Sequence, residues 1–298
     1  MRWQAPSLTD LLRHGILILG AAVILLPFVY MVSVSFKTPA EIAASSGGFF
    51  GDQTPMVDEL CAIRTGDEEG CMMRPVLHNY YKAFVENPLP RYLLNGVIVT
   101  ASIFLIQIII ALPAAYALAK LRFWGREVVF AVVLFCLLIP VHAIGVPLYL
   151  MLAKLALLNS YAALVIPWTI SVFGIFLMRQ FFKTVPDDLV DAARMDGISE
   201  FGIIWNVMVP TAIPALLAFA IFSVVAHWND YFWPRIVVTG NQNLFTPPLG
   251  IREFRNGIDG NQYGPLMATA TIIVVPLVAA FLLAQRRFIE GITLSGMK

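Results

Sequence analysis

Charged residues are scarce in this chain of 298 residues. Only 13% of its residues are Asp, Glu, Lys or Arg, and 59% are hydrophobic. A soluble globular domain has about 25% charged residues and an apolar share near 45–50%. The composition therefore excludes an ordinary soluble domain, because so much apolar surface requires lipid to cover it.

Motifs for catalysis and metal binding are also absent from the sequence. There is no G-x-x-x-x-G-K-[ST] nucleotide motif, no Lys follows a Gly, and there is no H-E-x-x-H zinc motif. We therefore expect no catalytic, metal or cofactor site on this chain, and we expect that it is not an enzyme. The four histidines lie in separate segments, at His14, His78, His142 and His227.

Long uncharged stretches dominate what the sequence does contain. Each of six stretches without Asp, Glu, Lys or Arg has at least 22 residues, and a helix rising about 1.5 Å per residue then crosses a hydrocarbon layer roughly 30 Å thick. We predict an all-α polytopic membrane protein with six transmembrane helices. The stretches are residues 15–36, 92–119, 128–153, 155–178, 201–229 and 260–285.

The basic residues predict the orientation of these helices. With a cytoplasmic N-terminus, and with the long first loop set aside, eleven Lys and Arg lie inside and four outside; this asymmetry follows the positive-inside rule. We expect both termini to be cytoplasmic. A cleaved signal peptide is the alternative for residues 15–36, but this run exceeds a signal core of about 7–15 residues and lacks an A-x-A site.

A polar loop over residues 37–91 separates the first two apolar stretches. It is rich in Gly, Pro and acidic residues and too long for a simple turn, so we expect a small extracytoplasmic fold there. Cys61 and Cys71 lie ten positions apart in it, and an oxidising compartment would let them form a disulfide; two free thiols are the alternative. Cys136, in an apolar stretch, is expected to be a small buried hydrophobe.

A polar segment between the fourth and fifth stretches predicts a short helix. Thr184 is placed to cap an early backbone N–H, and Pro186 is tolerated in a first turn. Asp187 and Asp188 favour the positive end of a helix. Gly197 supplies the left-handed residue that ends one. The segment therefore predicts a compact cytoplasmic helix between two membrane helices.

The side chains of this short helix favour docking on a protein. Leu189, Val190 and Ala193 fall on one side at helical spacing. The small side chains of Ala192 and Ala193 allow the helix to dock closely in a groove. The alternative is a helix lying flat on the bilayer, which predicts a basic polar face. Here the face is acidic and would be repelled by anionic lipid: it carries Asp187, Asp188, Asp191 and Asp196 against Arg194.

The same segment resembles a family signature. Asp191-Ala-Ala, three residues, Gly197, nine residues and Val207-x-Val-Pro210 resemble the E-A-A-x3-G-x9-I-x-L-P motif in membrane subunits of binding-protein-dependent ABC importers. Asp replaces Glu, and two Val residues replace Ile and Leu. Residues 91–95, 115–125, 176–182, 228–230 and 285–291 are similar to the maltose-type second permease subunit of the carbohydrate branch, and residues 44–75 look like an insertion.

The resemblance implies an ABC importer type I permease fold and a division of labour. Residues 1–298 would form one permease domain in a bacterial inner membrane, and residues 184–210 its coupling segment. The partners would be a second permease subunit, two ATPase subunits that bind ATP and Mg, an extracytoplasmic solute-binding protein that delivers sugar, and membrane lipid, with no nucleic acid. By resemblance the ATPase contact is carried by Asp191, Ala192, Ala193 and Gly197.

The substrate pathway is less clearly marked in the sequence. Aromatic side chains beside polar groups suit sugar rings, so Trp228, Asn229 and Asp230 are the pathway candidates, followed by an extracytoplasmic loop over residues 231–259. A self-contained secondary transporter is the alternative function, but it would want membrane-embedded carboxylates or inverted repeats. A scaffold protein is a third interpretation. The sequence does not name the sugar.

Overall fold

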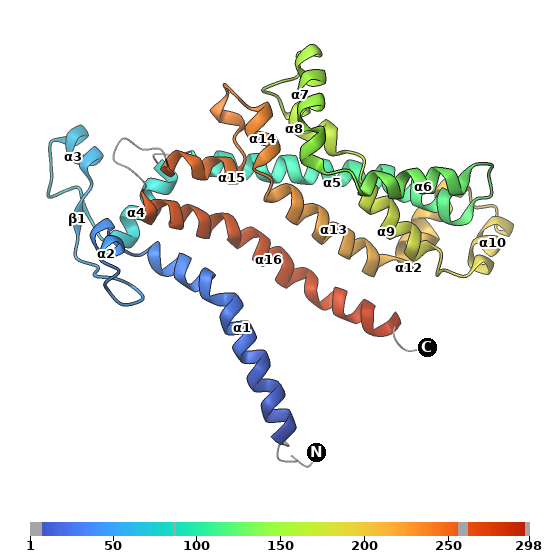
Figure 1. Ribbon diagram of the computed structural model, residues 1–298, viewed down its shortest axis with the longest axis horizontal. Helices are drawn as coiled ribbons and strands as arrows, with labels where there is room; N and C mark the ends of the chain where they lie inside the picture. The colour runs from blue at the N-terminus through green and yellow to red at the C-terminus, as the bar shows by residue number, and fades with distance from the viewer. Residues whose placement is uncertain (1–7, 86–87, 256–261, 296–298) are drawn as a thin grey trace. The chain divides into compact units, whose positions relative to one another are not determined.

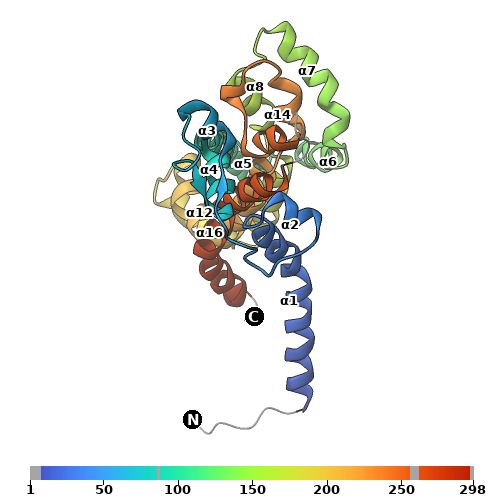
Figure 2. The ribbon, with the colours of Figure 1, turned by 90° about the vertical axis from the view of Figure 1, so that its left-hand side faces the viewer.

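The computed structural model describes residues 8–85, 88–255 and 262–295, and the described chain is almost entirely helical (Figures 1 and 2). It divides into two compact units. Unit 1 comprises Met1–Leu89 and Ile251–Val274, and unit 2 comprises Pro90–Gly250 and Val275–Lys298. The last helix, α16 (Tyr263–Ser295), begins in unit 1 and continues into unit 2.

Unit 1 combines a long apolar helix with a small, mostly polar fold. The long helix, α1, has exposed apolar side chains along its length, as contact with lipid requires. A two-stranded antiparallel sheet, with Met56 opposite Met73, closes the polar fold. The elements of this unit before α16 are α1 (Leu8–Val34), α2 (Pro39–Ala43), β1 (Met56–Val57), α3 (Glu59–Thr65), β2 (Met72–Met73), α4 (Pro75–Val85) and η5 (Ile251–Arg255).

A disulfide ties the polar fold together, in a segment that we call the appendage (Met56–Met73). Cys61 in α3 and Cys71 before β2 are bonded, with their Cα atoms 5.7 Å apart. Asp58 caps α3 by accepting a hydrogen bond from the Cys61 N–H at 2.9 Å, which satisfies one of the free donors at that helix end. The cap and the disulfide together hold a short chain segment that has little core of its own.

Unit 2 contains most of the remaining helices. Its 32-residue helix α5 packs with the helices of the second half of the chain around one hydrophobic core. The elements in this unit are α5 (Leu89–Lys120), α6 (Arg126–Leu137), η1 (Val141–Ile144), α7 (Gly145–Lys154), α8 (Tyr161–Val165), η2 (Ile166–Trp168), α9 (Val172–Phe182), α10 (Asp187–Met195), α11 (Glu200–Ile203), η3 (Ile204–Met208), α12 (Val209–Thr211), α13 (Ile213–Trp228), α14 (Phe232–Val237), η4 (Gln242–Leu244) and α15 (Pro247–Gly250).

The described residues contain five helical segments long and apolar enough to cross a membrane, or six if one sharply bent pair counts as a single span. The five are Thr9–Val34, Leu89–Lys120, Tyr161–Phe182, Ile213–Val237 and Tyr263–Leu283. The expected six helices therefore appear only when the bent pair is included.

The bent pair occupies the third uncharged stretch, residues 128–153, and its break lies at residues 138–140. The α6 helix ends at Leu137, and the next helical segment leaves at an angle of 94° (Figure 2). Pro140 follows α6, and proline offers no N–H to continue a helix. At Gly145, the first residue of α7, an added Cβ would lie 3.2 Å from the Phe232 ring. Glycine at this position therefore lets the backbone of α7 pass close to that ring.

Two other spans are shorter than predicted and interrupted. The fourth begins at Tyr161 rather than at residue 155, and its helix is broken between Val165 and Val172. Ser171 restarts it by accepting a hydrogen bond from the Gly174 N–H at 3.0 Å. The fifth span begins at Ile213 rather than at residue 201. Residues 200–211 form a contiguous helical run with a π-helical section at Ile204–Met208, and Ala212 separates this run from α13.

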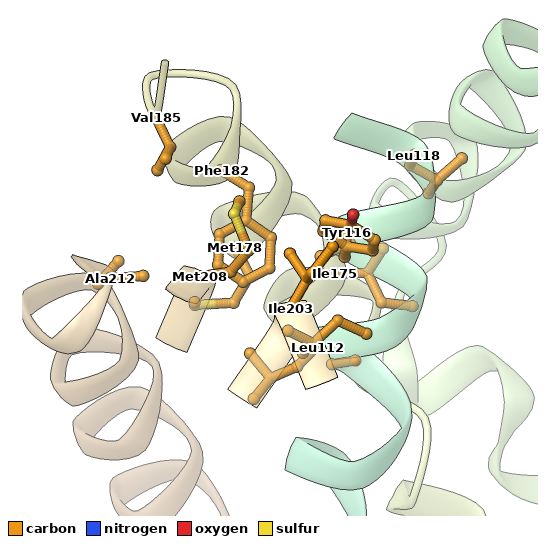
Figure 3. Packing of buried hydrophobic residues seen from close by; sticks show 14 of the residues in the cluster. Leu112, Tyr116, Leu118, Ile175, Met178, Phe182, Val185, Ile203, Met208 and Ala212 are labelled. Atoms are coloured by element: carbon orange, nitrogen blue, oxygen red, sulfur yellow. The ribbon is translucent and has the colours of Figure 1, made fainter. Parts of the chain in front are cut away.

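The core of unit 2 lies where α5 and α9 meet residues 203–219 (Figure 3), and α10 contributes Val190 and Ala193 to it. Phe182, Met178 and Met208 are fully buried in it. A Cβ at Gly174 would lie 2.3 Å from the Phe219 ring, so glycine at this position lets α9 approach α13 closely. The buried members are Ala111, Leu112, Ala115, Tyr116, Leu118, Phe130, Ile175, Met178, Phe182, Val185, Val190, Ala193, Ile203, Ile204, Met208, Ala212, Ala215 and Phe219.

Candidate functional site

The short helix α10 lies at one end of unit 2 (Figure 1), where it contacts α11 and the π-helical turn η3. Its start differs from the prediction. Thr184 does not cap α10: its hydroxyl donates to the Phe181 carbonyl at 2.8 Å, within the turn that ends α9. The capping position is occupied by Pro186 in an extended conformation. Without a side-chain cap, the acidic residues Asp187 and Asp188 complement the positive end of the helix.

The end of α10 has the predicted geometry. Gly197 adopts φ +77°, in the left-handed region. Its N–H donates to the Arg194 carbonyl, and the Ile198 N–H donates to the Ala193 carbonyl, each at 3.0 Å. Nothing lies within 4 Å of a Cβ added at Gly197. The requirement for glycine is therefore conformational rather than steric.

The faces of α10 are partly as predicted. Val190 and Ala193 are buried in the core, at 2% and 5% exposure, but Leu189 is 46% exposed. The predicted apolar side of three residues is therefore wrong at Leu189. Asp191 and Ala192 lie on the exposed side, whereas Ala193 points inward and supports the helix from below.

Two basic side chains organise the acidic groups around α10. Lys120 Nζ lies 2.5 Å from Asp187 Oδ1. Arg194 Nε donates to Glu200 Oε1 at 2.8 Å, and its Nη1 donates to Asp191 Oδ1 at 3.0 Å. A polar pocket of about 430 Å³ opens between these groups, and Lys120, Leu121, Arg122, Asp187, Val190, Asp191 and Arg194 line it.

These contacts shift the pKa values of the groups outside the membrane spans. The hydrogen bond from Arg194 lowers the pKa of Glu200, and the bond from Lys120 lowers the pKa of Asp187. The pKa of Arg194 is raised by its bond to Glu200. Because the folded-state carboxyl pKa values lie below the unfolded ones, these contacts are complete at neutral pH and are lost only as the pH falls through the lowered values.

The pathway candidates form local contacts in the structure. Trp228 is buried, and a Cβ added at Gly96 would lie 3.2 Å from its ring. Asn229 Nδ2 donates to the Val225 carbonyl at 2.8 Å, which ties it to its own helix. Asp230 Oδ1 accepts a hydrogen bond from the Trp233 N–H at 3.2 Å, where α14 begins. Asn229 and Asp230 thus help to end one helix and begin the next.

A different set of polar side chains meets at the break in the fourth span. Gln107 of α5, only 3% exposed, donates from Nε2 to the Trp168 carbonyl at 2.7 Å and lies 3.2 Å from His227 Nε2. Ser223 Oγ donates to Gln107 Oε1 at 2.6 Å. The Trp168 indole N–H is buried and has no acceptor among the described residues. We call these four residues the polar cluster.

The sequence did not predict the polar cluster. Gln107 stands out as a polar residue in an apolar stretch, but its partners lie 61, 116 and 120 positions later in the chain. No spacing motif connects residues so far apart. The described residues also contain no group of three or more His, Cys, Asp or Glu that would hold a metal ion.

The apolar spans, the broken helices and the short acidic helix between the fourth and fifth spans together define the membrane subunit of a transporter. The chain belongs to the family of binding-protein-dependent transport system inner membrane components, whose model matches residues 107–293. The ABC importer permeases of this family are transport components rather than enzymes, and the matched domain includes the region of the E-A-A-like motif.

Known proteins resemble this chain over most of its length. The arabinooligosaccharides transport system permease protein AraQ of Halalkalibacterium halodurans is 36% identical over 204 residues, which cover 68% of this chain and 72% of AraQ. The sn-glycerol-3-phosphate transport system permease protein UgpE of Shigella flexneri is 32% identical over 292 residues, covering 96% of each chain.

A solved structure has the same fold. It is a chain of a bacterial ABC transporter involved in the import of the acidic polysaccharide alginate. The TM-score is 0.75 at 21% sequence identity, and the match covers 96% of this chain and 100% of that chain. The fold is therefore that of an ABC importer permease, as the sequence predicted.

Proposed function

We propose that this chain forms one half of the membrane pathway of an ATP-driven importer for a sugar or sugar derivative. The relatives support this substrate class, because AraQ is named for arabinooligosaccharides and UgpE for sn-glycerol-3-phosphate. A second permease subunit would complete the pathway. An extracytoplasmic solute-binding protein would deliver the substrate, and both termini of this chain would be cytoplasmic. The distribution of basic residues supports that orientation.

We infer that α10 is the coupling helix, which receives movement from two ATPase subunits that bind ATP and Mg. The observation that carries this role is a short, outward-facing helix whose underside is anchored in the core by Val190 and Ala193. Its exposed side offers Asp191 and Ala192, and Gly197 fixes the turn that follows. Closure of the ATPase dimer would then switch the pathway between inward- and outward-facing states.

The substrate would pass the polar cluster. Polar groups and broken helices at membrane depth are tolerated only where protein or water covers them. Amide, hydroxyl, imidazole and indole groups are suited to the hydroxyls and ring faces of a sugar. The acidic residues of the described spans, Asp10, Glu127 and Asp230, lie near helix ends. This placement favours an importer subunit over a self-contained secondary transporter, which would need carboxylates inside the membrane to carry a coupling ion.

Two substitutions in α10 and its end test the coupling role. Asp191→Lys reverses a charge on the docking face, and Gly197→Val puts a β-branched residue at φ +77°, a costly conformation for it. In the complete importer reconstituted in vesicles, both variants should insert and bind the second permease subunit. ATPase association, or stimulation of ATP hydrolysis by the loaded binding protein, should fall together with uptake.

Matched controls separate these effects from general damage. Asp10→Lys reverses an exposed charge on α1, and Gly20→Val adds the same side chain at a glycine that also has nothing within 4 Å of its Cβ position but lies inside a helix. Both controls should transport normally. Wild-type coupling in Asp191→Lys and Gly197→Val would mean that α10 is not the coupling helix.

A further inference from the structure

The last turns of α5 contact the start of α10 and Glu200, the first residue of α11. Tyr116 and Lys120 lie four residues apart, so their side chains project from the same face of α5. Lys120 reaches the start of α10, and Tyr116 reaches the residues that follow its end. One membrane-spanning helix thus holds both flanks of the short helix.

Lys120 holds the start of α10. Its side chain is only 5% exposed. Its ammonium group donates to the Val185 carbonyl and to Asp187 Oδ1. A buried ammonium group is stable only when it is paired and hydrogen-bonded. Separating α10 from α5 would leave this charge without these partners, so the contact resists relative movement of the two helices.

Tyr116 holds the other end through a chain of hydrogen bonds. Its hydroxyl, on a side chain that is almost fully buried, donates to Glu200 Oε2 at 2.5 Å. Glu200 Oε1 accepts from Arg194 Nε at 2.8 Å, and Arg194 in turn binds Asp191 at 3.0 Å. The chain therefore connects a residue inside the span with the acidic residue on the exposed side of α10.

The underside of α10 completes the attachment. Val190 and Ala193 belong to the same buried cluster as Leu112, Tyr116 and Leu118 of α5. Burial of these apolar side chains stabilises the contact between α10 and α5. The hydrogen bonds of Lys120 and Tyr116 fix the position of α10 on α5. By contrast, the chain itself joins α10 to α9 and α11 only through short non-helical links, at residues 183–186 and 196–199.

We propose that α10 and the Lys120 end of α5 move as one body, with Tyr116 and Lys120 as the positioning residues that keep them together. This inference rests on the proposed role of α10 as the coupling helix. Movement of the ATPases would then pass directly into a membrane-spanning helix that carries Gln107, rather than through the links at either end of α10.

Single substitutions test the two contacts separately. Tyr116→Phe removes one hydroxyl, and Lys120→Met removes the charge while keeping most of the side-chain bulk. In the reconstituted importer, ATPase subunits should still bind, because the exposed face of α10 is intact. The number of sugar molecules imported per ATP hydrolysed should fall about fivefold in each variant.

Two further variants serve as controls. Tyr161→Phe removes a tyrosine hydroxyl that donates to Asn95 Oδ1, near the opposite end of α5, and should leave the ratio of sugar to ATP unchanged. Lys120→Arg keeps a positive donor and should retain most of the coupling. If Tyr116→Phe and Lys120→Met import as much sugar per ATP as the wild type, the inference is wrong.

A covalent tether provides a positive test that loss of folding cannot imitate. Lys120→Cys and Asp187→Cys are combined in a Cys136→Ala background and joined by a short bifunctional maleimide in the complete importer. Each single cysteine variant should lose coupling, and the cross-linked double variant should regain it. If cross-linking abolishes transport instead, α10 moves relative to α5 and the inference fails.

The outcomes distinguish this inference from the proposed function. Normal coupling in Asp191→Lys and Gly197→Val would remove the coupling role of α10 altogether. Defective coupling in those variants, together with normal coupling in Tyr116→Phe and Lys120→Met, would retain the coupling helix and reject only its attachment to α5.

Discussion

The guanidinium carbon of Arg179 lies 3.5 Å from the centre of the Phe130 ring, so a positive charge rests on an aromatic face inside unit 2. Arg179 is 4% exposed, its Nε donates to the Leu118 carbonyl at 3.1 Å, and its Nη2 lies 3.5 Å from Glu127 Oε2. These contacts join α9 to α5 and α6 close to the turn that leads into α10.

Replacing this arginine should weaken the fold of unit 2. Arg179→Lys keeps the charge but loses the flat contact with Phe130 and the donor to Leu118. We expect a loss of about 2 kcal/mol in stability, measured as a lower thermal unfolding temperature in detergent. Arg126→Lys is the control: its ion pair with Glu127 at 3.0 Å is more exposed and should cost less than about 1 kcal/mol. Equal losses would contradict the prediction.

The buried indole N–H of Trp168 predicts that a substitution there changes transport without lowering the stability of the fold. Trp168→Phe removes a donor that has no acceptor among the described residues, so folding should lose no hydrogen bond. If the sugar accepts this bond during passage, KM for transport should rise about three- to tenfold, measured as uptake in vesicles.

A second tryptophan in unit 2 provides the matched control. The Trp233 indole N–H donates to the Ala163 carbonyl at 2.9 Å. Trp233→Phe should therefore lower the unfolding temperature without a selective effect on KM. An unchanged KM in Trp168→Phe would exclude its indole N–H from substrate contact.

The orientation predicts which positions an impermeant thiol reagent can reach. In a background without the native cysteines, Gly51→Cys and Asn241→Cys should react from outside in sealed cells, because both lie in loops expected to be extracytoplasmic. Ser199→Cys, between α10 and α11, should react only after the cells are opened. Labelling of Ser199→Cys in sealed cells would reverse the assigned orientation.

The disulfide of the appendage should be present in protein isolated from the membrane. Peptide mass spectrometry without reduction should find Cys61 linked to Cys71, and Cys136 free. Closing a loop of this size stabilises by roughly 2.5–3 kcal/mol in the chain-entropy model, so Cys61→Ser should make the appendage more sensitive to protease. Recovery of both thiols free, from an oxidising compartment, would refute the prediction.

The two ends of α10 show what local sequence can and cannot predict. Gly197 was correctly predicted because few residues other than glycine adopt a left-handed conformation without strain. Thr184 was misassigned because a threonine shortly before acidic residues fits two roles equally well. It can cap the next helix, or it can belong to the turn that ends the preceding one. Its hydroxyl is already bonded to Phe181, and Pro186 takes the capping position.

The apolar stretches predicted the class of fold but not the course of each helix. An uncharged stretch indicates only that lipid or protein covers it. The stretch therefore does not distinguish a straight helix from a bent pair such as α6 and α7. The close approach of Gly145 to Phe232, which lies 87 positions later, arises only in the folded protein. Likewise, Leu189 has the spacing of a core residue but not its burial.

The candidate site likewise has a part that the sequence predicted and a part that it did not. The acidic helix and its glycine are contiguous in sequence, so their pattern and the resemblance to a signature motif were visible together. The polar cluster and the contacts of Tyr116 and Lys120 join segments that are distant in sequence, and only the folded chain brings them together. For Trp228, Asn229 and Asp230, the role in the pathway stays a prediction. Residues 256–259 of the predicted loop lie outside the described residues.

The paired strands β1 and β2 also explain how this permease could acquire an extra segment. Met56 lies opposite Met73, so the chain leaves the appendage beside the point where it starts. This segment contacts α4 through the pair of Asp58 Oδ2 and His78 Nε2, which lie 3.5 Å apart. The exposed part of the segment, at residues 63–70, can therefore be lengthened or exchanged while that pair is kept. Evolution can therefore remodel the exposed surface of this loop while the helices of the subunit stay the same.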